Sequence, residues 1–446
     1  MGKRMKSALF VSLVLASLAS LFSSIPLFAQ TDTETMQKLL QRVDALEKRL
    51  AETEAKLAEA QKTVAELPAV KPEAKAPTSF AAVANSRIEF YGYAKLDMAY
   101  DTGRVAPGNY ALFVDPLPLN QNNNSQYNMT ANQTRLGMNF TAMDTGDAKV
   151  TGKLEVDFYG NGVANNKAAP LLRHAYLMVA WPKYDFSILA GQTSDIISPL
   201  VAPTINYTVL WDQGNIGYRR PQLRFDKGWK MGDKSRFDWQ LGFTWNAGHA
   251  YTNVSGVYNS GVTSDSPTFQ TRFGFTFPGA SSRPVNLGIS GHYGREVFLA
   301  GTQNETSKRL SSYSYNFDAS VPLSKKWTFQ GEYFYGADLD QYFGGSSQAI
   351  DLTHERGTIS QGGWAAISYQ HSPNLAFNFG GGADSPRISY LETGARGNNE
   401  SLFANVWYTL AKQTQVGFEV SRLSTGYVEK PTVTAMRYQL AFQYNF

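Results

Sequence analysis

The C-terminal residues of the chain alternate between apolar and polar side chains. Apolar residues occupy every second position from Met436 to Phe446, and small or polar residues such as Arg437, Gln439 and Gln443 lie between them. A period of two predicts a β-strand with one apolar and one polar face. A strand of this length can also cross a bilayer at a tilt.

The same period recurs from residue 87 to the C-terminus, in short runs separated by Gly, Asn, Asp, Ser and Pro. In residues 149–159 and 236–246, for example, charged or polar side chains alternate with Val, Leu, Phe or Trp. These runs predict about 16 strands. The strands start near Ile88, Gln133, Lys149, Arg173, Asp185, Arg219, Arg236, Phe269, Val285, Tyr313, Trp327, Gly363, Leu375, Ser401, Thr414 and Ala435.

Each of these strands carries one apolar face, and the opposite face carries charges of both signs. A soluble domain of this size would need a very large apolar core. A wide barrel places the apolar face in lipid and the charged face in a water-filled lumen. Aromatic residues also occur near strand ends, where a membrane interface favours them; they are Tyr100, Phe140, Trp181, Trp327, Tyr335 and Tyr408. We therefore predict an all-β transmembrane barrel of about 16 antiparallel strands over residues 87–446, with a soluble all-β domain as the alternative.

A different period precedes the barrel. Residues 34–67 form five heptads without a slip, with Met36, Val43, Leu50, Leu57 and Val64 at position a. This pattern predicts an α-helical coiled coil, assigned to residues 30–67, and favours a homo-oligomer with parallel chains. A lone solvated helix or a hairpin is the alternative. Residues 68–86 are rich in Pro, Ala and Lys and read as a linker.

The first 29 residues have the composition of a signal peptide. Three basic residues precede the apolar run 8–21, and a small residue, Ala29, is available at the cleavage site. An uncleaved anchor is the alternative. Export and a barrel together predict the outer membrane of a Gram-negative bacterium, with the coiled coil in the periplasm. Outer-membrane lipid is then a partner.

Composition excludes several other functions. The chain has no cysteine, which excludes thiolate metal sites and cysteine nucleophiles. Of its 41 basic residues three lie in the signal peptide, which leaves 38 against 37 acidic residues and no tract suited to nucleic acid. The five histidines show no metal-ligand spacing. We expect no enzyme activity, no cofactor and no metal.

Strand parity identifies side chains that point into the lumen. Arg135 alternates with Leu136 and Met138, for example, and Arg220 alternates with Pro221. The inward basic residues predicted to line the pore and bind anions are Lys95, Arg135, Lys153, Arg173, Arg220, Arg224 and Arg272. Guanidinium groups in a narrow pore would concentrate anions. In the alternative, these residues are the solvated wall of any large barrel, paired with inward acids.

One connection, residues 193–217, is unusually apolar for a loop. We expect it to fold into the barrel as a constriction; packing at the centre of a trimer is the alternative. The residues predicted to form the constriction are Asp195, Tyr207, Trp211 and Asp212.

Several stretches together resemble the DcaP-like outer-membrane porins. They are residues 90–97 (Phe-Tyr-Gly-Tyr-Ala-Lys-Leu-Asp), 133–140, 152–158, 172–176, 190–195 and 215–225. The resemblance implies a trimer of 16-stranded barrels, each preceded by a periplasmic coiled coil. It also implies pores that favour small anions such as dicarboxylates. The C-terminal strand is similar to the signal read by the barrel-assembly machinery, carried here by Tyr438, Leu440, Phe442, Tyr444 and Phe446.

The sequence thus predicts an outer-membrane porin for passive uptake of small, preferably anionic solutes. A phosphate-selective, sugar-selective or general diffusion porin is the alternative. A trimeric surface adhesin anchored by a barrel is a remote one, because each chain has enough strands for its own pore. The coiled coil could serve trimerisation or attachment to the cell wall.

Overall fold

The computed structural model describes residues 86–120, 124–142, 145–160, 167–246, 248–253, 256–279, 281–299, 306–351 and 354–446. The predicted signal peptide (1–29), the coiled coil (30–67) and all but the last residue of the linker lie outside the described residues. None of the helices in the described residues is long and apolar enough to cross a membrane.

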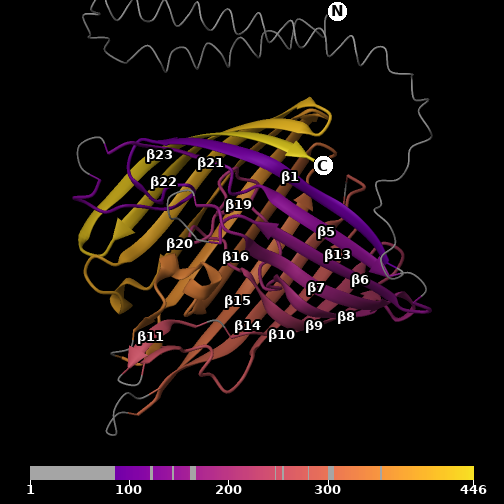
Figure 1. The fold of residues 1–446 in the computed structure, drawn as a ribbon, viewed down its shortest axis with the longest axis horizontal. Coiled ribbons are helices and arrows are strands. Elements are labelled where there is room, and N and C mark those ends of the chain that lie inside the picture. Colours follow the sequence, from indigo (N-terminus) through magenta and orange to yellow (C-terminus); the bar gives the residue numbers. More distant parts are fainter. Residues whose placement is uncertain are drawn as a thin grey trace, which may run out of the picture. The chain divides into compact units, whose positions relative to one another are not determined.

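Long antiparallel strands dominate these residues (Figure 1). The strands of the main sheet are β1 (Ser86–Asp101), β4 (Gln126–Thr130), β5 (Arg135–Ala142), β6 (Lys149–Asp157), β7 (Leu171–Trp181), β8 (Phe186–Ser194), β9 (Arg219–Lys230), β10 (Arg236–Thr244), β13 (Thr268–Phe277), β14 (Val285–Phe298), β15 (Lys308–Pro322), β16 (Trp327–Ala337), β19 (Ile359–Ser372), β20 (Leu375–Pro386), β21 (Arg396–Ala411), β22 (Thr414–Tyr427) and β23 (Lys430–Asn445).

Short elements occupy the connections. They are the strand pairs β2 (Val105–Pro107) with β3 (Ala111–Val114), β11 (Ala250–Asn253) with β12 (Gly256–Asn259), and β17 (Ile350–Asp351) with β18 (Arg356–Gly357), and the 3-10 helices η1 (Pro182–Tyr184), η2 (Asp340–Tyr342), η3 (Gly345–Ser347) and η4 (Ile388–Tyr390).

The main sheet closes on itself. β23 pairs antiparallel with β1, and the other side of β1 pairs with both β4 and β5. β4 and β5 are therefore two halves of one strand interrupted at residues 131–134, and the 17 segments form a closed barrel of 16 strands, as the alternation predicts.

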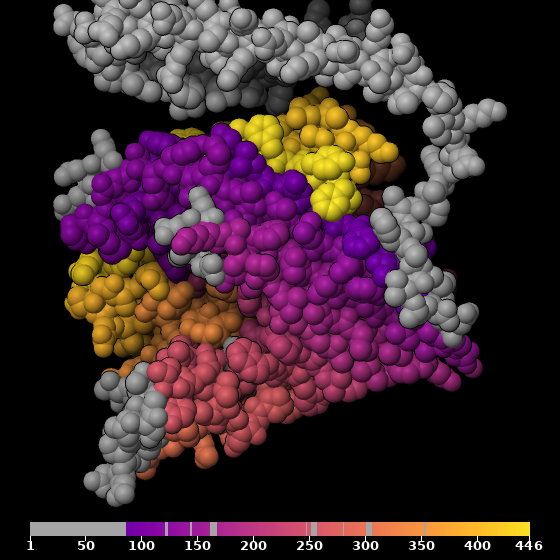
Figure 2. Space-filling view, in the orientation of Figure 1, coloured from indigo at the N-terminus to yellow at the C-terminus, as the bar shows by residue number. Residues whose placement is uncertain are grey.

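The backbone of Phe446 completes the seam, because its N–H and C=O both bond to Gly92 on β1. A Cβ at position 92 would lie 2.9 Å from the Phe446 ring and closer still to the Arg135 carbonyl, so the seam requires a glycine here. The C-terminal residues lie next to the N-terminal strand in Figure 2 as well.

Burial is reversed relative to a soluble protein. On β15 the outward Tyr315 is 67% exposed, whereas the inward Ser314 and Asp318 are almost fully buried. β23 shows the same pattern, with exposed Phe442 and fully buried Arg437. A surface of large apolar side chains around a polar interior fits lipid outside and polar contents inside.

The two ends of the barrel differ. Short turns such as residues 182–185, 231–235 and 412–413 connect strands at the end that holds the C-terminus, here called the turn end. Longer connections, among them residues 195–218, 245–267 and 338–358, join strands at the opposite end, the loop end. This asymmetry is typical of outer-membrane barrels.

Candidate functional site

Residues 195–218, here called the inserted loop, cross the interior of the barrel. The loop leaves β8 and returns to β9, yet its residues bond to strands remote in the sheet. On β16, the Glu332 carboxylate accepts hydrogen bonds from Ser198 Oγ at 2.6 Å and from the Leu200 N–H at 2.8 Å. The sheet order places four strands between β9 and β16, so the loop spans the lumen.

A second carboxylate holds the middle of the inserted loop. Glu419 of β22 accepts bonds from Thr204 Oγ at 2.7 Å and from the Ile205 N–H at 2.6 Å. Asn399 of β21 donates to the Asp212 carbonyl at 2.7 Å. We call the side of the lumen that carries Glu332, Asn399, Asn405 and Glu419 the anchoring wall.

The four residues predicted as a constriction all lie inside the barrel but have different partners. Asp195 forms an ion pair with Arg220, with Oδ1 and Nε 2.9 Å apart, and the Tyr207 hydroxyl donates to Asp157 at 3.2 Å. The Trp211 ring stacks on Phe343, with ring centroids 4.7 Å apart.

Asp212 has its hydrogen-bond donors in the 338–358 loop. Its carboxylate is fully buried and accepts bonds from the N–H and the Oγ of Ser347, at 2.7 and 2.9 Å. Burial, together with the neighbouring charge of Asp384, raises the pKa of Asp212 to about 8. Asp212 therefore fixes the inserted loop to the 338–358 loop.

Basic side chains face an open cavity of about 580 Å³ between β1, β5–β7 and the inserted loop. Arg135, Lys153, Arg173 and Arg219 line it, and we call this side the basic wall. Glu155 is the one carboxylate among the described residues that line the cavity. It accepts from Arg173 Nε at 2.8 Å, and Arg135 Nε lies 3.5 Å away.

The lining therefore holds four basic side chains against one carboxylate, and Arg173 also bonds to Asp157, behind the lining, at 2.6 Å. Lys153 Nζ is 4.0 Å from Glu155, at the limit of an ion pair, and also lies 5.0 Å above the Tyr91 ring. The Arg135 guanidinium lies over Tyr93. Such contacts with π faces hold a cation in place without neutralising it.

Arg173 lies where the regular alternation of its strand is interrupted. The pairing of β6 with β7 shifts register between Glu155 and Val156, which leaves Arg173 without a paired residue while His174 pairs with Glu155. A bulge of this kind re-aims side chains. As a result the consecutive Arg173 and His174 both line the cavity.

Arg219 was not among the predicted pore residues. It begins β9, one position out of phase with Arg220, and its side chain turns inward beside the inserted loop. The guanidinium lies 4.6 Å from the Tyr218 ring centroid and 5.7 Å from that of Trp211. It is buried, forms no ion pair with a described carboxylate, and its Nε and Nη2 have no hydrogen-bond acceptor among the described residues. In the sequence, the two consecutive arginines at the start of the strand, Arg219 and Arg220, were the one feature that could have indicated this position.

The remaining predicted cations are neutralised by adjacent acids. Lys95 Nζ is 3.1 Å from Asp97 and bonds to Gln133, and Arg220 is paired with Asp195 as described. These groups form the polar interior without adding free positive charge to the cavity.

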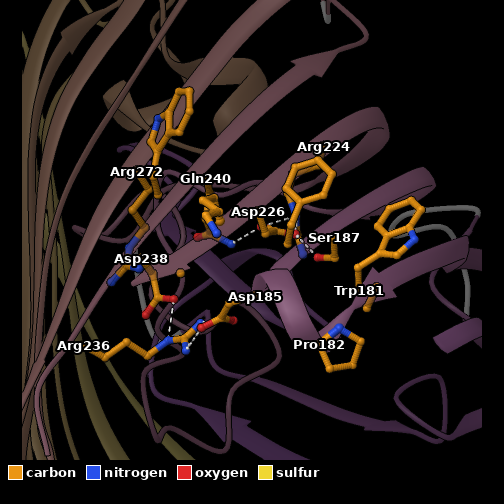
Figure 3. Close-up of a pocket in the computed structure, with 15 residues that line it drawn as sticks. Trp181, Pro182, Asp185, Ser187, Arg224, Asp226, Arg236, Asp238, Gln240 and Arg272 are labelled. Carbon is orange, nitrogen blue, oxygen red and sulfur yellow. Dashed lines mark hydrogen bonds and ion pairs between the residues drawn. The ribbon is translucent and has the colours of Figure 1, made fainter. Parts of the chain in front are cut away.

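Toward the turn end, Arg224 and Arg272 lie in a second cavity (Figure 3). Arg224 Nε bonds to Asp226 at 3.1 Å, and Arg272 forms a two-pronged pair with Asp318 at 2.9 and 2.6 Å. Dashed lines in Figure 3 mark similar pairs around Arg236. Charges therefore alternate in sign along this part of the wall.

Aromatic rings next to the open cavity form a cluster that sequence reasoning missed. Tyr207 packs on Tyr159 at 4.0 Å between ring centroids, and Tyr110 contacts both rings. Trp211 and Tyr218 continue the cluster to Phe343. Burial raises the pKa of Tyr207, so its hydroxyl stays a neutral donor. These rings come from four loops, and strand parity carries no information about loops.

The fold and the outward apolar face define a transmembrane β-barrel of the outer-membrane porin type. The model of a family described as DcaP outer membrane protein matches residues 30–227. A search of curated proteins found no significant match.

Three solved structures illustrate the likeness. The outer membrane channel DcaP of Acinetobacter baumannii superposes with a TM-score of 0.66 at 20% identity, covering 83% of this chain and all of that one. An anion-selective porin from Comamonas acidovorans gives 0.52 at 10% identity, with 81% and 100% coverage. The trimer form of OmpT from Vibrio cholerae gives 0.50 at 9% identity, with 81% and 99% coverage. At these identities the likeness shows the shared fold.

Proposed function

We propose that this protein is an outer-membrane porin for passive diffusion of small anionic solutes, with carboxylates and dicarboxylates as the preferred class. The observation that carries this proposal is Arg219. It is a buried guanidinium without a carboxylate partner among the described residues, and it faces the open cavity of the basic wall, beside the inserted loop. Burying a cation without a partner costs folding free energy. A side chain that is nevertheless kept unpaired at the cavity is suited to bind a passing anionic solute.

The surroundings of Arg219 strengthen the proposal. The cavity carries a surplus of cations because Glu155 is shared by Arg173 and Arg135. A guanidinium offers two parallel N–H groups that match a carboxylate. The inserted loop narrows the lumen at this level, and a confined, low-dielectric passage strengthens the selection by charge. The similar Comamonas porin is described as anion-selective.

Reversal potentials in planar bilayers test the proposal. Under a KCl gradient, the wild-type channel should show the sign of an anion-selective pore, and Arg219→Gln should reduce the potential markedly. Arg422→Gln is the matched control, because Arg422 is exposed on β22 with the outward parity of Phe418, away from the lumen. A cation-selective wild-type channel, or equal potentials in wild type and Arg219→Gln, would contradict the proposal.

A sugar channel is the second candidate, favoured by the aromatic cluster. Tyr207, Trp211 and Tyr218 line the same cavity as the basic wall, and rings can stack on the apolar faces of a sugar. Current block by a neutral disaccharide compared with block by succinate separates the two functions. Dominant block by the disaccharide that is lost in Trp211→Ala would favour the sugar channel.

We also propose that three copies assemble and that residues 30–67 contribute through a parallel coiled coil. The heptads support this assembly, as does the trimer form of the similar OmpT. Deleting residues 30–85 and measuring the oligomer mass in detergent tests the idea. A deletion variant that stays trimeric would leave the coiled coil a role in spacing or attachment to the cell wall.

A further inference from the structure

Three loop-end segments bring a histidine and three carboxylates together outside the pore cavity. His249 lies in the 245–267 loop, Glu296 near the end of β14, and Asp338 and Asp340 at the start of the 338–358 loop. One donor atom each from His249, Glu296 and Asp338 fall within 4.8 Å of one another. These residues are far apart in sequence, so no motif with a fixed residue spacing predicts the cluster.

Asp338 is the unusual member. Its side chain is 1% exposed, and neither carboxylate oxygen receives a hydrogen bond from the described residues. It lies beside the buried carboxylate of Glu296, and burial together with the charges of Glu296 and Asp340 raises the pKa of Asp338. Two carboxylates that face each other without a donor require a shared proton or a cation between them.

His249 is oriented as a metal ligand would be. Its Nε2 lies 2.6 Å from Asp340 Oδ2, while Nδ1 lies 2.8 Å from Glu296 Oε2. Histidine ligands commonly donate their second N–H to a carboxylate, which fixes the tautomer and leaves the other nitrogen for the metal. Here Asp340 is that carboxylate, and Nδ1, which contacts Glu296 Oε2, is the nitrogen that remains for the metal.

The backbone around the cluster is already fixed. The His249 N–H donates to Ser260 Oγ at 2.7 Å, and the same hydroxyl donates to Glu296 Oε2 at 2.5 Å. The Asp338 N–H bonds to the Thr358 carbonyl, and Ser312 Oγ donates to the Asp338 carbonyl at 2.7 Å. The three ligand positions are therefore held before any ion binds.

Charge points to a divalent ion. Among the described residues, His249 is the one cationic group in ion-pair distance of Glu296 and Asp340, and Asp338 has none. Even with a charged imidazole, three carboxylates leave two negative charges. One imidazole with two carboxylates is a donor set suited to Zn²⁺ and neighbouring transition metals, whereas Ca²⁺ and Mg²⁺ prefer oxygen ligands alone.

We propose that His249, Glu296 and Asp338 bind one divalent transition-metal ion of the zinc class, with Asp340 orienting the histidine. The ion ties the 245–267 loop and β14 to the 338–358 loop. This loop also touches the pore region, because Arg220 Nη2 donates to the Gln341 carbonyl at 3.2 Å and the Arg220 guanidinium lies 4.0 Å from the Tyr342 ring. The site thus fixes the outer mouth above the Arg220–Asp195 pair.

The competing arrangement is a metal-free cluster held by a protonated histidine. Burial lowers the pKa of His249, but its bonds to Asp340 and Glu296 outweigh burial and raise the pKa to about 11.

Cobalt provides a direct test. Full-length protein without a polyhistidine tag is treated with chelator in detergent and titrated with Co²⁺, followed by visible absorption. We expect one Co²⁺ per chain, displaced by Zn²⁺. Asp338→Asn and Glu296→Gln should each weaken binding at least about tenfold, since even the loss of an outer-shell partner costs 10- to 100-fold.

Asp351→Asn is the matched control. Asp351 contacts His354 at 2.7 Å in the same loop, but this pair has a largely exposed histidine and no third ligand. Because Asp338→Asn removes charge repulsion from a buried site, it should fold in the absence of metal.

Two results would overturn the assignment. The first is no Co²⁺ or Zn²⁺ binding, or equal binding by wild type and both cluster variants, which would leave the protonated-histidine cluster. The second is thermal stabilisation by Ca²⁺ but not by Zn²⁺ that disappears in Asp338→Asn. This result would identify the site as a calcium site and contradict the assignment to a transition metal. Both readouts are independent of ion selectivity in the pore.

Discussion

The two sides of the lumen use inward carboxylates for opposite purposes. On the anchoring wall, Glu332 and Glu419 accept hydrogen bonds from the inserted loop, and neither forms an ion pair among the described residues. On the basic wall, Glu155 and Asp157 accept bonds from the guanidinium of Arg173. Strand parity gives all four the same inward direction, so the role of each is set by its partners, which are loop residues for Glu332 and Glu419 and strand residues such as Arg173 for Glu155.

This division explains how an interior with mixed charges can leave one open region positive. The acids of the anchoring wall are covered by the loop they hold. The cations of the basic wall outnumber the carboxylate in their cavity. The loop covers both acids of the anchoring wall, whereas on the basic wall it reaches Asp157 through the Tyr207 hydroxyl and leaves Glu155 in the cavity lining.

The largest effect is expected from Glu419→Ala on the anchoring wall. The change removes the acceptor of Thr204 Oγ, the Ile205 N–H and Asn405 Nδ2, whose bonds measure 2.7, 2.6 and 2.8 Å. Each buried donor left without an acceptor costs about 1–3 kcal/mol. The free energy of unfolding measured in urea should therefore fall by roughly 4 kcal/mol. Released from its anchor, the loop should also give a larger and noisier single-channel conductance.

Glu392→Ala, an exposed residue between β20 and β21, is the control for this experiment. It should match the wild type in both stability and conductance. An anchoring-wall variant with lower stability but unchanged conductance would mean that the loop does not limit the current.

A smaller effect with a different signature is expected from Glu155→Gln on the basic wall. Glutamine keeps an acceptor for Tyr91 or Arg173 but removes the charge shared by Arg173 and Arg135. Losing one partner of a partly buried ion pair costs about 3 kcal/mol in unfolding free energy. Arg135 then loses its carboxylate, whereas Arg173 keeps Asp157. The added positive charge should shift the reversal potential toward stronger anion selectivity, whereas Glu419→Ala should not. An unchanged or weaker anion preference in Glu155→Gln would contradict the division between the walls.

The barrel could be predicted from local pattern alone. Alternation is a property of each strand, and it led to the 16 strands and to the inward direction of Arg135 and Arg220. Closure also followed, because a C-terminal strand with one apolar face needs a partner at each edge, and β1 supplies the second one.

The arrangement inside the barrel depends on contacts between distant segments. The bulge that turns both Arg173 and His174 inward appears only in the pairing of β6 with β7. Arg219 turns inward because the inserted loop packs beside it, out of phase with its strand. The aromatic cluster combines four loops. The alternation of apolar and polar residues predicts none of these three features. Each arises where the alternation is interrupted or in a loop that has no alternation.

Asp212 gives a pH-dependent prediction for the contact between the inserted loop and the 338–358 loop. Its pKa is raised from about 3.8 to about 8 by burial, so the folded protein binds a proton that the unfolded chain releases. The stabilisation from this proton is complete below about pH 4 and is lost as pH rises through 8. Between pH 5 and 7 it should fall by about 2 kcal/mol.

Asp212→Asn should remove this part of the pH dependence, because its side chain stays neutral while still accepting from Ser347. Unfolding in urea at pH 5 and pH 7 measures the difference. Asp233→Asn, in an exposed turn between β9 and β10, should retain the wild-type dependence. If the unfolding free energy changes equally between pH 5 and pH 7 in wild type and Asp212→Asn, Asp212 is ionised in the folded protein.

The smallest effect is expected from Lys153→Gln, which tests how far the basic wall acts through charge alone. Lys153 lies 4.0 Å from Glu155 with a side chain 28% exposed, and its partner is already bound by Arg173 at 2.8 Å. A pair of this kind contributes about 0–1 kcal/mol, so stability should hardly change. The reversal potential should still move slightly toward zero, because one of four cavity cations is lost, and the shift should be smaller than in Arg219→Gln. If Lys153→Gln instead equals or exceeds Arg219→Gln, selectivity follows the summed charge of the wall and not the single unpaired guanidinium.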